Sequence, residues 1–311
     1  MLGAFARFMF IKIYFAAVAA AGLGFLALLL YRCIKERAQL KAEPGNPLLL
    51  ALYSAALQFV TAFGVSDFSV SIIVYRRLHL VEDEKLPGTL LTACVVPVAV
   101  MALGYLTVAR VEELTLAVCV LCGIAGAVAG TRTVSRLNAS AVRLLMALAL
   151  LSAAAMMVLR SLGLMPGGGH AAGFHGWRLA VTAAVAFLLS ALSMGGFTVS
   201  AMLLCFFYAM GLEPSAAFPL AMGTCSIACA FGGIRYVRQG NFSKKLALYS
   251  SLFGGLGAFV AVRFVHGLDV TVLQWLITAV ALYSAFSLLR EYLREHHKTA
   301  VSPEKGSDVH V

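Results

Sequence analysis

One apolar unit occurs twice in this chain, and that duplication limits the folds open to it. When the sequence is moved along itself by 131 residues, a series of positions match, among them Arg132 with Arg263 and Gly126 with Gly257. Apolar helices often share Leu, Ala and Gly by chance, but an arginine is rarely matched by accident in such a chain. The sequence therefore predicts two copies of one membrane unit.

The composition indicates that these units lie in a lipid bilayer. Apolar residues make up 61% of the 311 residues and charged residues only 12%, whereas soluble domains carry about 25% charged residues. Several apolar stretches reach roughly 20 residues, the length that crosses a hydrocarbon core. The net charge of +10 comes from short loops and the tail, where Lys and Arg orient the spans and contact anionic lipid. We therefore expect the bilayer as a partner and no nucleic acid.

The first apolar segment, from about Phe8 to Tyr31, is expected to be an uncleaved membrane helix outside the repeats. Four basic residues follow it between positions 32 and 41, as in a stop-transfer signal, and it lacks a convincing small-residue cleavage site. Seven cysteines lie, all but one, within apolar segments, so we interpret them as small packing residues.

Each repeat opens with an apolar stretch of unusual length, Pro47–Tyr75 in the first and Leu179–Leu212 in the second. Both are interrupted near the middle, at Gly64–Asp67 and at Ser193–Gly196. A straight helix of 29 residues would be about 44 Å long, too long for one upright crossing and too short for two. The stretches are thus either tilted single helices or hairpins of two half-length helices that enter and leave on the same side.

Loop charge favours the hairpins. With hairpins, the predicted cytoplasmic segments hold 18 of the 24 Lys and Arg, whereas single crossings reduce that number to 15. The hairpin topology starts repeat one from the cytoplasm and repeat two from outside, so the repeats are predicted to be inverted. Three ordinary spans are expected after each hairpin, at about 89–108, 114–131, 143–162, 215–234, 246–265 and 271–290.

The predicted fold is an all-α polytopic membrane protein with two inverted-topology repeats. Each repeat is a broken-helix hairpin plus three transmembrane helices, and one extra N-terminal helix precedes them. The predicted divisions are the extra helix and linker 1–46, repeat one 47–162, an extracytoplasmic Gly-rich connection 163–178, repeat two 179–290 and a polar cytoplasmic tail 291–311.

Repeat two carries a series of short motifs in a characteristic order. The Gly-rich break Ser193–Ser200 is followed by Gly211–Pro214, Ala217–Ser226, Arg238–Phe242 and Gly254–Ala258. In order and spacing this sequence resembles the sulfite exporter TauE/SafE family of membrane permeases, also called the toluene-sulfonate uptake permease family. Each motif is short, and the series as a whole carries the resemblance.

The resemblance covers roughly residues 50–290 and implies a permease of the cytoplasmic membrane that moves a small anion. Members often carry sulfur-containing oxyanions or organosulfonates. Repeat one departs from the family pattern, because it has Gly64–Phe68 where the family has a run of glycines and Gly88–Cys94 where it has a Thr-Ser-like element. Only repeat two keeps a glycine-rich backbone cradle, so the identity of the substrate is not carried over.

The two breaks are the predicted anion site. A helix that restarts at the midplane leaves backbone N–H groups unpaired, and its dipole favours negative charge. Hydroxyl side chains at the breaks and on the next helices can add donors, although small hydroxyl residues also serve close helix packing. The candidate substrate-binding residues are Gly64, Ser66, Ser69, Thr89, Thr92, Gly195, Gly196, Thr198, Ser200, Thr224 and Ser226.

Asp67 is the one acid expected at membrane depth, where an acid marks a functional site by default. Two roles remain open: it takes up and releases a proton that couples transport to a gradient, or it caps the local helix start. Gln58 is the other buried polar candidate for proton coupling. An alternative function follows from Asp67, namely a permease for a cation or a neutral metabolite.

An intramembrane enzyme is the least favoured class. It would need a nucleophile and base, or a metal site, at membrane depth, yet all seven His lie in loops, span ends or the tail. We expect no enzyme activity, no cofactor and no metal. The sequence does not indicate the oligomeric state.

Overall fold

The long apolar segments form helices of membrane-spanning length. The computed structural model describes residues 2–63, 65–106, 111–133, 151, 171–195, 199–265 and scattered positions between 272 and 293. Five helices there match a span in length and composition, namely Met9–Lys35, Asp83–Tyr105, Glu113–Thr131, Ala216–Gln239 and Lys244–Phe264. Those residues contain no strand beyond an isolated bridge between Ala171 and Leu212. The prediction of an all-α membrane protein is confirmed for this part of the chain.

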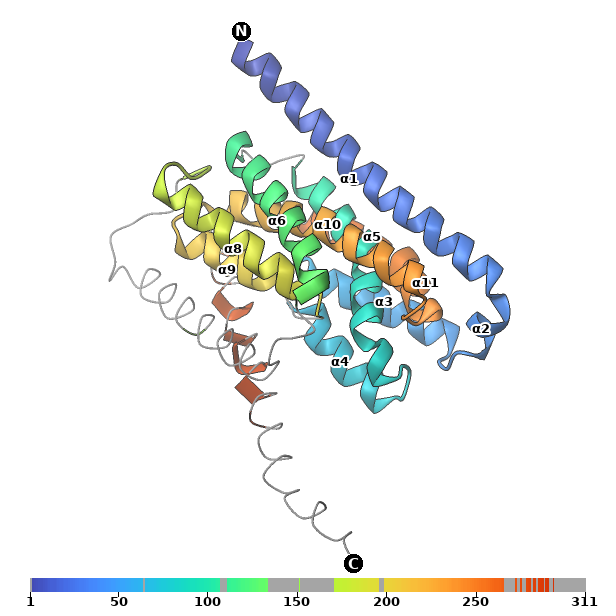
Figure 1. Cartoon of the computed structure of the whole chain (residues 1–311). Coiled ribbons are helices and arrows are strands. Elements are labelled where there is room, and N and C mark those ends of the chain that lie inside the picture. The colour runs from blue at the N-terminus through green and yellow to red at the C-terminus, as the bar shows by residue number, and fades with distance from the viewer. Residues whose placement is uncertain are drawn as a thin grey trace, which may run out of the picture.

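The helices begin and end close to the predicted bounds (Figure 1). The chain begins with four helices, α1 (Leu2–Lys35), α2 (Arg37–Ala42), α3 (Pro47–Thr61) and α4 (Asp67–Arg77). A 3₁₀ turn η1 (Asp83–Lys85) leads into α5 (Leu86–Leu106), followed by α6 (Glu113–Thr133). The second half contains α8 (Trp177–Ser193), α9 (Ser200–Ala209), α10 (Pro214–Gln239), α11 (Lys244–Tyr249), a π-helical turn η3 (Ser250–Gly254) and α12 (Gly255–Val265).

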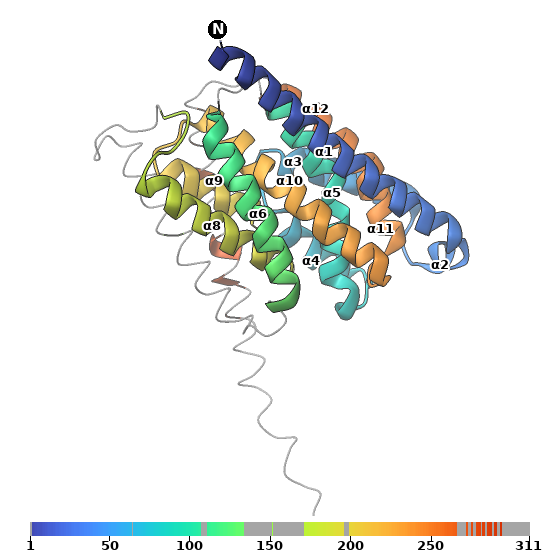
Figure 2. The same cartoon turned by 45° about the horizontal axis from the view of Figure 1, so that its top comes forward.

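Helix α1 lies along the outside of the bundle in both views (Figures 1 and 2). Its inner face buries Phe25 and Leu29 completely, while Leu23 on the outer face is 67% exposed. An exposed apolar face on a helix of this length is typical of contact with lipid. The extra helix is thus present as predicted, and it packs against α5 and α10.

Both opening stretches are broken where the sequence predicts a break. In the first, α3 ends at Thr61 and α4 begins at Asp67; in the second, α8 ends at Ser193 and α9 begins at Ser200. The 15 residues of α3 give a helix of about 22 Å, which is shorter than a hydrocarbon core of about 30 Å. These helices therefore reach only part of the way across.

The first stretch, α3 with α4, folds back on itself, and we call it hairpin one. The Tyr53 hydroxyl near the start of α3 lies 3.3 Å from the Ser71 Oγ of α4. The Tyr53 ring also lies 6.1 Å from the ring of Tyr75, which is near the end of α4. In a continuous helix Tyr53 and Tyr75 would be about 33 Å apart. The two arms therefore run in opposite directions, and a single tilted helix is excluded here.

The second stretch, α8 with α9, folds back in the same way and is called hairpin two. Ala171, six residues before α8, forms a bridge with Leu212, which follows α9. The Glu213 N–H donates to the Ala171 carbonyl at 3.0 Å. The chain therefore leaves hairpin two beside the point where it entered.

The two hairpins open toward opposite faces of the bundle. One face, here called the basic face, holds Arg32, Lys35, Arg76, Arg77, Lys85, Arg238, Lys244 and Lys245. Contacts of Arg32 with Arg238, of Lys244 with Glu36 and of Asn241 with Glu84 bring these helix ends together. Hairpin one opens there, because Lys245 Nζ donates to the Gly45 carbonyl just before α3. Helix α10 ends at the same face, where Arg32 donates to the Arg238 carbonyl. Hairpin two opens at the far end of α10, beside Glu213.

The linker into hairpin one is fixed by polar contacts that the sequence did not predict. The Glu43 carboxylate accepts bonds from the backbone N–H groups of Lys244 and Lys245, at 3.0 and 2.8 Å, and from the Ser243 hydroxyl at 2.7 Å. A carboxylate at this position accepts hydrogen bonds from N–H groups at the start of α11 that have no partner within the helix. The short helix α2 and this carboxylate thus join the two halves at the basic face.

Some predicted segments lie outside the described residues. These are the spans 143–162 and 271–290 apart from single positions, residues 163–170 of the connection 163–178, and the tail beyond Leu293. The predicted domain divisions and the symmetry between the repeats therefore remain predictions.

Candidate functional site

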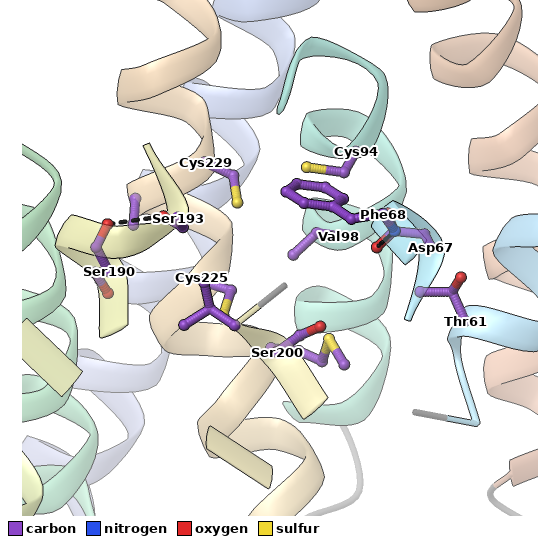
Figure 3. A pocket seen from close by; sticks show the side chains of 13 residues that line it. Thr61, Asp67, Phe68, Cys94, Val98, Ser190, Ser193, Ser200, Cys225 and Cys229 are labelled. Carbon is purple, nitrogen blue, oxygen red and sulfur yellow. Dashed lines mark hydrogen bonds between the residues drawn. The ribbon is translucent and has the colours of Figure 1, made fainter. Parts of the chain in front are cut away.

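A cavity lies where the two hairpin breaks meet. Its walls come from hairpin one, hairpin two, α5 and α10, and its lining residues are Thr61, Asp67, Phe68, Cys94, Val98, Ser190, Ser193, Val199, Ser200, Met222, Cys225, Ala228 and Cys229. Figure 3 shows the Phe68 ring among Cys94, Cys229 and Val98. Counted as space for the centre of a water molecule, the cavity volume is about 30 Å³, whereas one water needs roughly 10–15 Å³. In this conformation the cavity suits a small inorganic ion or a few waters.

Only some of the predicted site residues line this cavity. Asp67 and Ser200 do, from the starts of α4 and α9. Ser66 is fully buried in the first break and Gly195 lies in the second, yet neither is part of the lining. Gly64, Gly196, Thr198 and the side chain of Ser69 are outside the described residues.

Four predicted hydroxyl residues do not line this cavity, and their place in a substrate site stays a prediction. Each donates to a carbonyl of its own helix: Thr89 to Lys85 at 2.7 Å, Thr92 to Gly88 at 2.8 Å, Thr224 to Leu220 at 2.8 Å and Ser226 to Gly223 at 3.0 Å. Thr89 also accepts from the Ser243 N–H at the basic face. Ser226 faces Tyr14 of α1, at 3.4 Å. Their hydroxyls therefore serve helix backbones and packing.

The Asp67 carboxylate is buried at the first residue of α4 and makes hydrogen bonds through both oxygens. Oδ1 accepts from the Phe68 N–H at 3.0 Å, and Oδ2 accepts from Gln58 Nε2 at 3.3 Å. The bond to Phe68 is a cap-like contact with the first turn of α4. The other amide atom of the buried Gln58, Oε1, has no hydrogen-bond partner among the described residues. Asp67 therefore has a capping contact and a flexible polar neighbour at the same time.

The start of α9 differs from the start of α4, because no side chain among the residues that the structure describes caps it. Val199 occupies the N-cap position, makes no capping hydrogen bond and lines the cavity together with Ser200. The first N–H groups of a helix lack partners within the helix, and together with the dipole they favour an anion. The cavity thus borders one uncapped helix start and one that already carries a carboxylate.

Most of the residues that line the cavity were not predicted from the sequence. Cys94, Cys225 and Cys229 line the cavity with their thiols, although they read in the sequence as small apolar residues. Ser190 and Ser193 come from the last turn of α8, and the Ser190 Oγ has no hydrogen-bond partner. Ser193 could have been predicted to line the cavity, because it lies at the predicted break Ser193–Gly196. The orientation of the other four residues depends on helix packing. Despite the three thiols and Asp67, no group of three metal-ligating side chains close enough to hold an ion occurs among the described residues.

Comparison with known proteins points to one family. The model of the family Sulfite exporter TauE/SafE matches residues 178–308, which begin at α8 and include hairpin two, α10 and α12. This confirms the resemblance predicted from the sequence, over the second half of the chain. The family is one of membrane transporters and exporters. No curated protein and no solved structure matches the chain.

Proposed function

We propose that this chain is a secondary permease of the cytoplasmic membrane that moves a small anion, with a sulfur-containing oxyanion as the preferred class and an organosulfonate as the larger alternative. The observation that carries the proposal is the uncapped start of α9 beside a cavity at the meeting point of the two breaks. Broken helices that meet near the midplane are where transporters of this kind bind their substrates.

The polar groups of the cavity support an anion. The hydroxyls of Ser190 and Ser200 and the thiols of Cys225 and Cys229 are able to donate hydrogen bonds to an ion in the cavity. Thr61, Ser193 and Cys94 already donate to carbonyls of their own helices. Backbone N–H groups at the start of α9 add the dipole of a helix. A small oxyanion such as sulfite fits the cavity volume of about 30 Å³ better than an aryl sulfonate does; the larger substrate would require the hairpins to separate.

An inverted relation between the halves is also supported by equivalent packing contacts. A Cβ on Gly126 of α6 would overlap the Phe187 carbonyl of α8, and a Cβ on Gly257 of α12 would overlap the Ala55 carbonyl of α3. Gly126 and Gly257 are 131 residues apart, and Ala55 and Phe187 are 132 apart. The second span after the hairpin in each half, α6 or α12, thus crosses the first hairpin arm of the other half at the same relative position, while the hairpins open to opposite faces.

The alternative of a cation or neutral substrate is less favoured. A cation would need the Asp67 oxygens as ligands, but both already accept hydrogen bonds from Gln58 and Phe68. The described lining offers hydroxyls, thiols and apolar groups, with Asp67 as its one carboxylate. The start of α9 would moreover repel a cation.

The test is transport by the purified chain in proteoliposomes. Radiolabelled sulfite should enter liposomes that contain the chain, and excess thiosulfate, organosulfonates or carboxylates should rank the substrate classes by competition. Ser200→Leu fills the cavity at the start of α9 and should abolish uptake, whereas Ser200→Ala removes one hydroxyl and should retain most of it. If Ser200→Leu transports as well as the wild type in correctly folded protein, the site lies elsewhere. If no anion is transported, the proposed function is wrong.

A further inference from the structure

We propose that Asp67, Ser71 and Tyr53 form a proton relay inside hairpin one, which connects the cavity to the basic face, with the ring of Tyr75 packed against that of Tyr53. The inference rests on the proposed function only in taking the cavity as the transport site. It assigns to hairpin one a task that hairpin two does not share, namely the delivery of a proton from one side of the membrane.

The spacing of the polar residues on α4 is the first observation. Asp67, Ser71 and Tyr75 are four residues apart and therefore lie on one face of the helix, about one turn from each other. All three are buried, with exposed fractions of 6%, 4% and 2%. A row of ionisable and hydroxyl groups is costly in an apolar setting unless its members pair with one another.

The second observation is that the row continues into α3. Tyr53 OH and Ser71 Oγ lie 3.3 Å apart, and either can be the donor. The Tyr75 hydroxyl also lies beside Ser71, and the Tyr53 and Tyr75 rings meet edge to face. Tyr53 is only partly buried and lies about 9 Å along α3 from Pro47 at the basic face. The row therefore runs from the cavity toward that face.

These contacts allow a proton to pass without any lasting charge on the hydroxyl groups. Water at the basic face gives a proton to the Tyr53 oxygen as the Tyr53 O–H proton passes to Ser71, and the Ser71 proton passes to the Asp67 carboxylate, directly or through one water. One proton is taken from solvent and one carboxylate becomes a carboxylic acid. Because Tyr53 and Ser71 can each donate or accept, the same steps can run in reverse.

Gln58 can bind both states of the carboxyl group. When Asp67 is ionised, Gln58 Nε2 donates to it and Oε1 is left without a partner. When Asp67 is protonated, a rotated amide can accept the new O–H through Oε1. The other titratable groups that face Asp67 are the thiols of Cys94 on α5 and Cys225 on α10 and the phenols of Tyr53 and Tyr75.

Hairpin two lacks the relay. When Phe68–Ser71 is aligned with Phe197–Ser200, a shift of 129 residues, Asp67, Ser71 and Tyr75 correspond to Gly196, Ser200 and Leu204. Tyr53 corresponds to Val185 at the shift of 132 that relates Ala55 to Phe187. At these equivalent positions hairpin two therefore has one hydroxyl, that of Ser200, and neither the acid nor the phenols. A structural need common to both hairpins would have left similar residues in both. The difference indicates that only the basic face supplies protons to the cavity.

The test measures protonation of Asp67 in the full chain without any substrate. Protons are released by a flash from a photolabile acid, and the infrared band of the protonated carboxyl group that is absent in Asp67→Asn is followed in time. Ser71→Ala and Tyr53→Phe should slow its rise by about a hundredfold, the lower end of what a positioned proton-transfer group contributes. Ser71→Thr, which restores a hydroxyl, should recover most of the rate.

Tyr14→Phe is the matched control, because Tyr14 is a buried tyrosine of α1 whose hydroxyl bonds the Gly223 carbonyl outside the relay. It should leave the rate unchanged. A band that rises equally fast in Ser71→Ala, Tyr53→Phe and the wild type would overturn the relay, and so would the absence of the band in the wild type. If the wild type shows the relay but does not move sulfite, the proposed function fails while the relay stands.

Discussion

Gly257→Ala adds a single methyl group at the crossing of α12 and α3, and its cost follows from the geometry there. A Cβ at Gly257 would overlap the carbonyl oxygen of Ala55, so the two helices must separate to admit it. Overpacking of this kind costs about 1–3 kcal/mol. Alanine is favoured over glycine within a helix by about 0.5–1 kcal/mol. The expected net loss of stability is therefore about 0.5–2 kcal/mol.

Two further glycine variants make the experiment specific. Gly126→Ala introduces the equivalent overlap with Phe187 and should lose a similar amount of stability, whereas a Cβ at Gly24 of α1 meets no atom within 4 Å. Gly24→Ala should therefore be neutral or slightly stabilising. Thermal unfolding in detergent, followed by a dye that reacts with the buried cysteines, would report the differences. A protein of this size loses about 1–2 °C for each kcal/mol.

The result that would refute the reasoning is a melting temperature for Gly257→Ala equal to that of Gly24→Ala. It would mean that α3 and α12 are not held in close backbone contact. A large loss for Gly257→Ala with none for Gly126→Ala would leave the contact at α12 intact but contradict the equivalence of the two crossings, and with it the support for an inverted repeat.

Three further predictions concern charge. Asp67→Asn should keep sulfite exchange across the membrane and lose accumulation driven by a pH gradient; loss of both would indicate a binding or folding defect instead. Single cysteines placed at the exposed Glu84 and Gln239, in a background without native cysteines, should both resist an impermeant maleimide from outside, and labelling of either would contradict the predicted topology. The hydrogen bond from Lys244 lowers the pKa of Glu36. This pair therefore stabilises the fold at pH values above the ordinary pKa of Glu. The stabilisation is lost as the pH falls through the lower pKa that Glu36 has in the folded protein. Between roughly pH 5 and pH 3 the melting temperature of the wild type should therefore fall more than that of Glu36→Gln, and equal falls would contradict the contribution of the pair.

The sequence was sufficient to predict the helices and their breaks. Long apolar stretches fix where helices run, and the polar or glycine-rich interruptions at Gly64–Asp67 and Ser193–Gly196 fix where they stop. The structure breaks the chain between Thr61 and Asp67 and between Ser193 and Ser200. The charge pattern also favoured hairpins, which agrees with the contacts of Tyr53 and of Ala171.

The faces of the helices could not be predicted in the same way. In a helix that is apolar all round, no periodicity distinguishes the side toward the cavity from the side toward a neighbouring helix. Thr224 and Cys225 are adjacent in sequence, yet only Cys225 lines the cavity. Ser226 faces α1 because that helix docks on α10, and α1 lies outside the duplicated unit. Which side chains of a helix face the cavity depends on tertiary packing, which a single sequence does not reveal.

The two hairpin breaks carry opposite electrostatic features, and this difference accounts for the place of Asp67. At hairpin one the carboxylate of Asp67 meets the first turn of α4, so that helix start is already neutralised. At hairpin two the start of α9 has no capping side chain and borders the cavity. An anion is therefore attracted to hairpin two, while hairpin one holds the group that can change its charge with a proton. If the carboxylate is ionised, it repels an anion in the cavity; if it is protonated, that repulsion is removed. Proton binding at one break and anion binding at the other would thus favour each other, which is the coupling that a proton-driven anion permease requires.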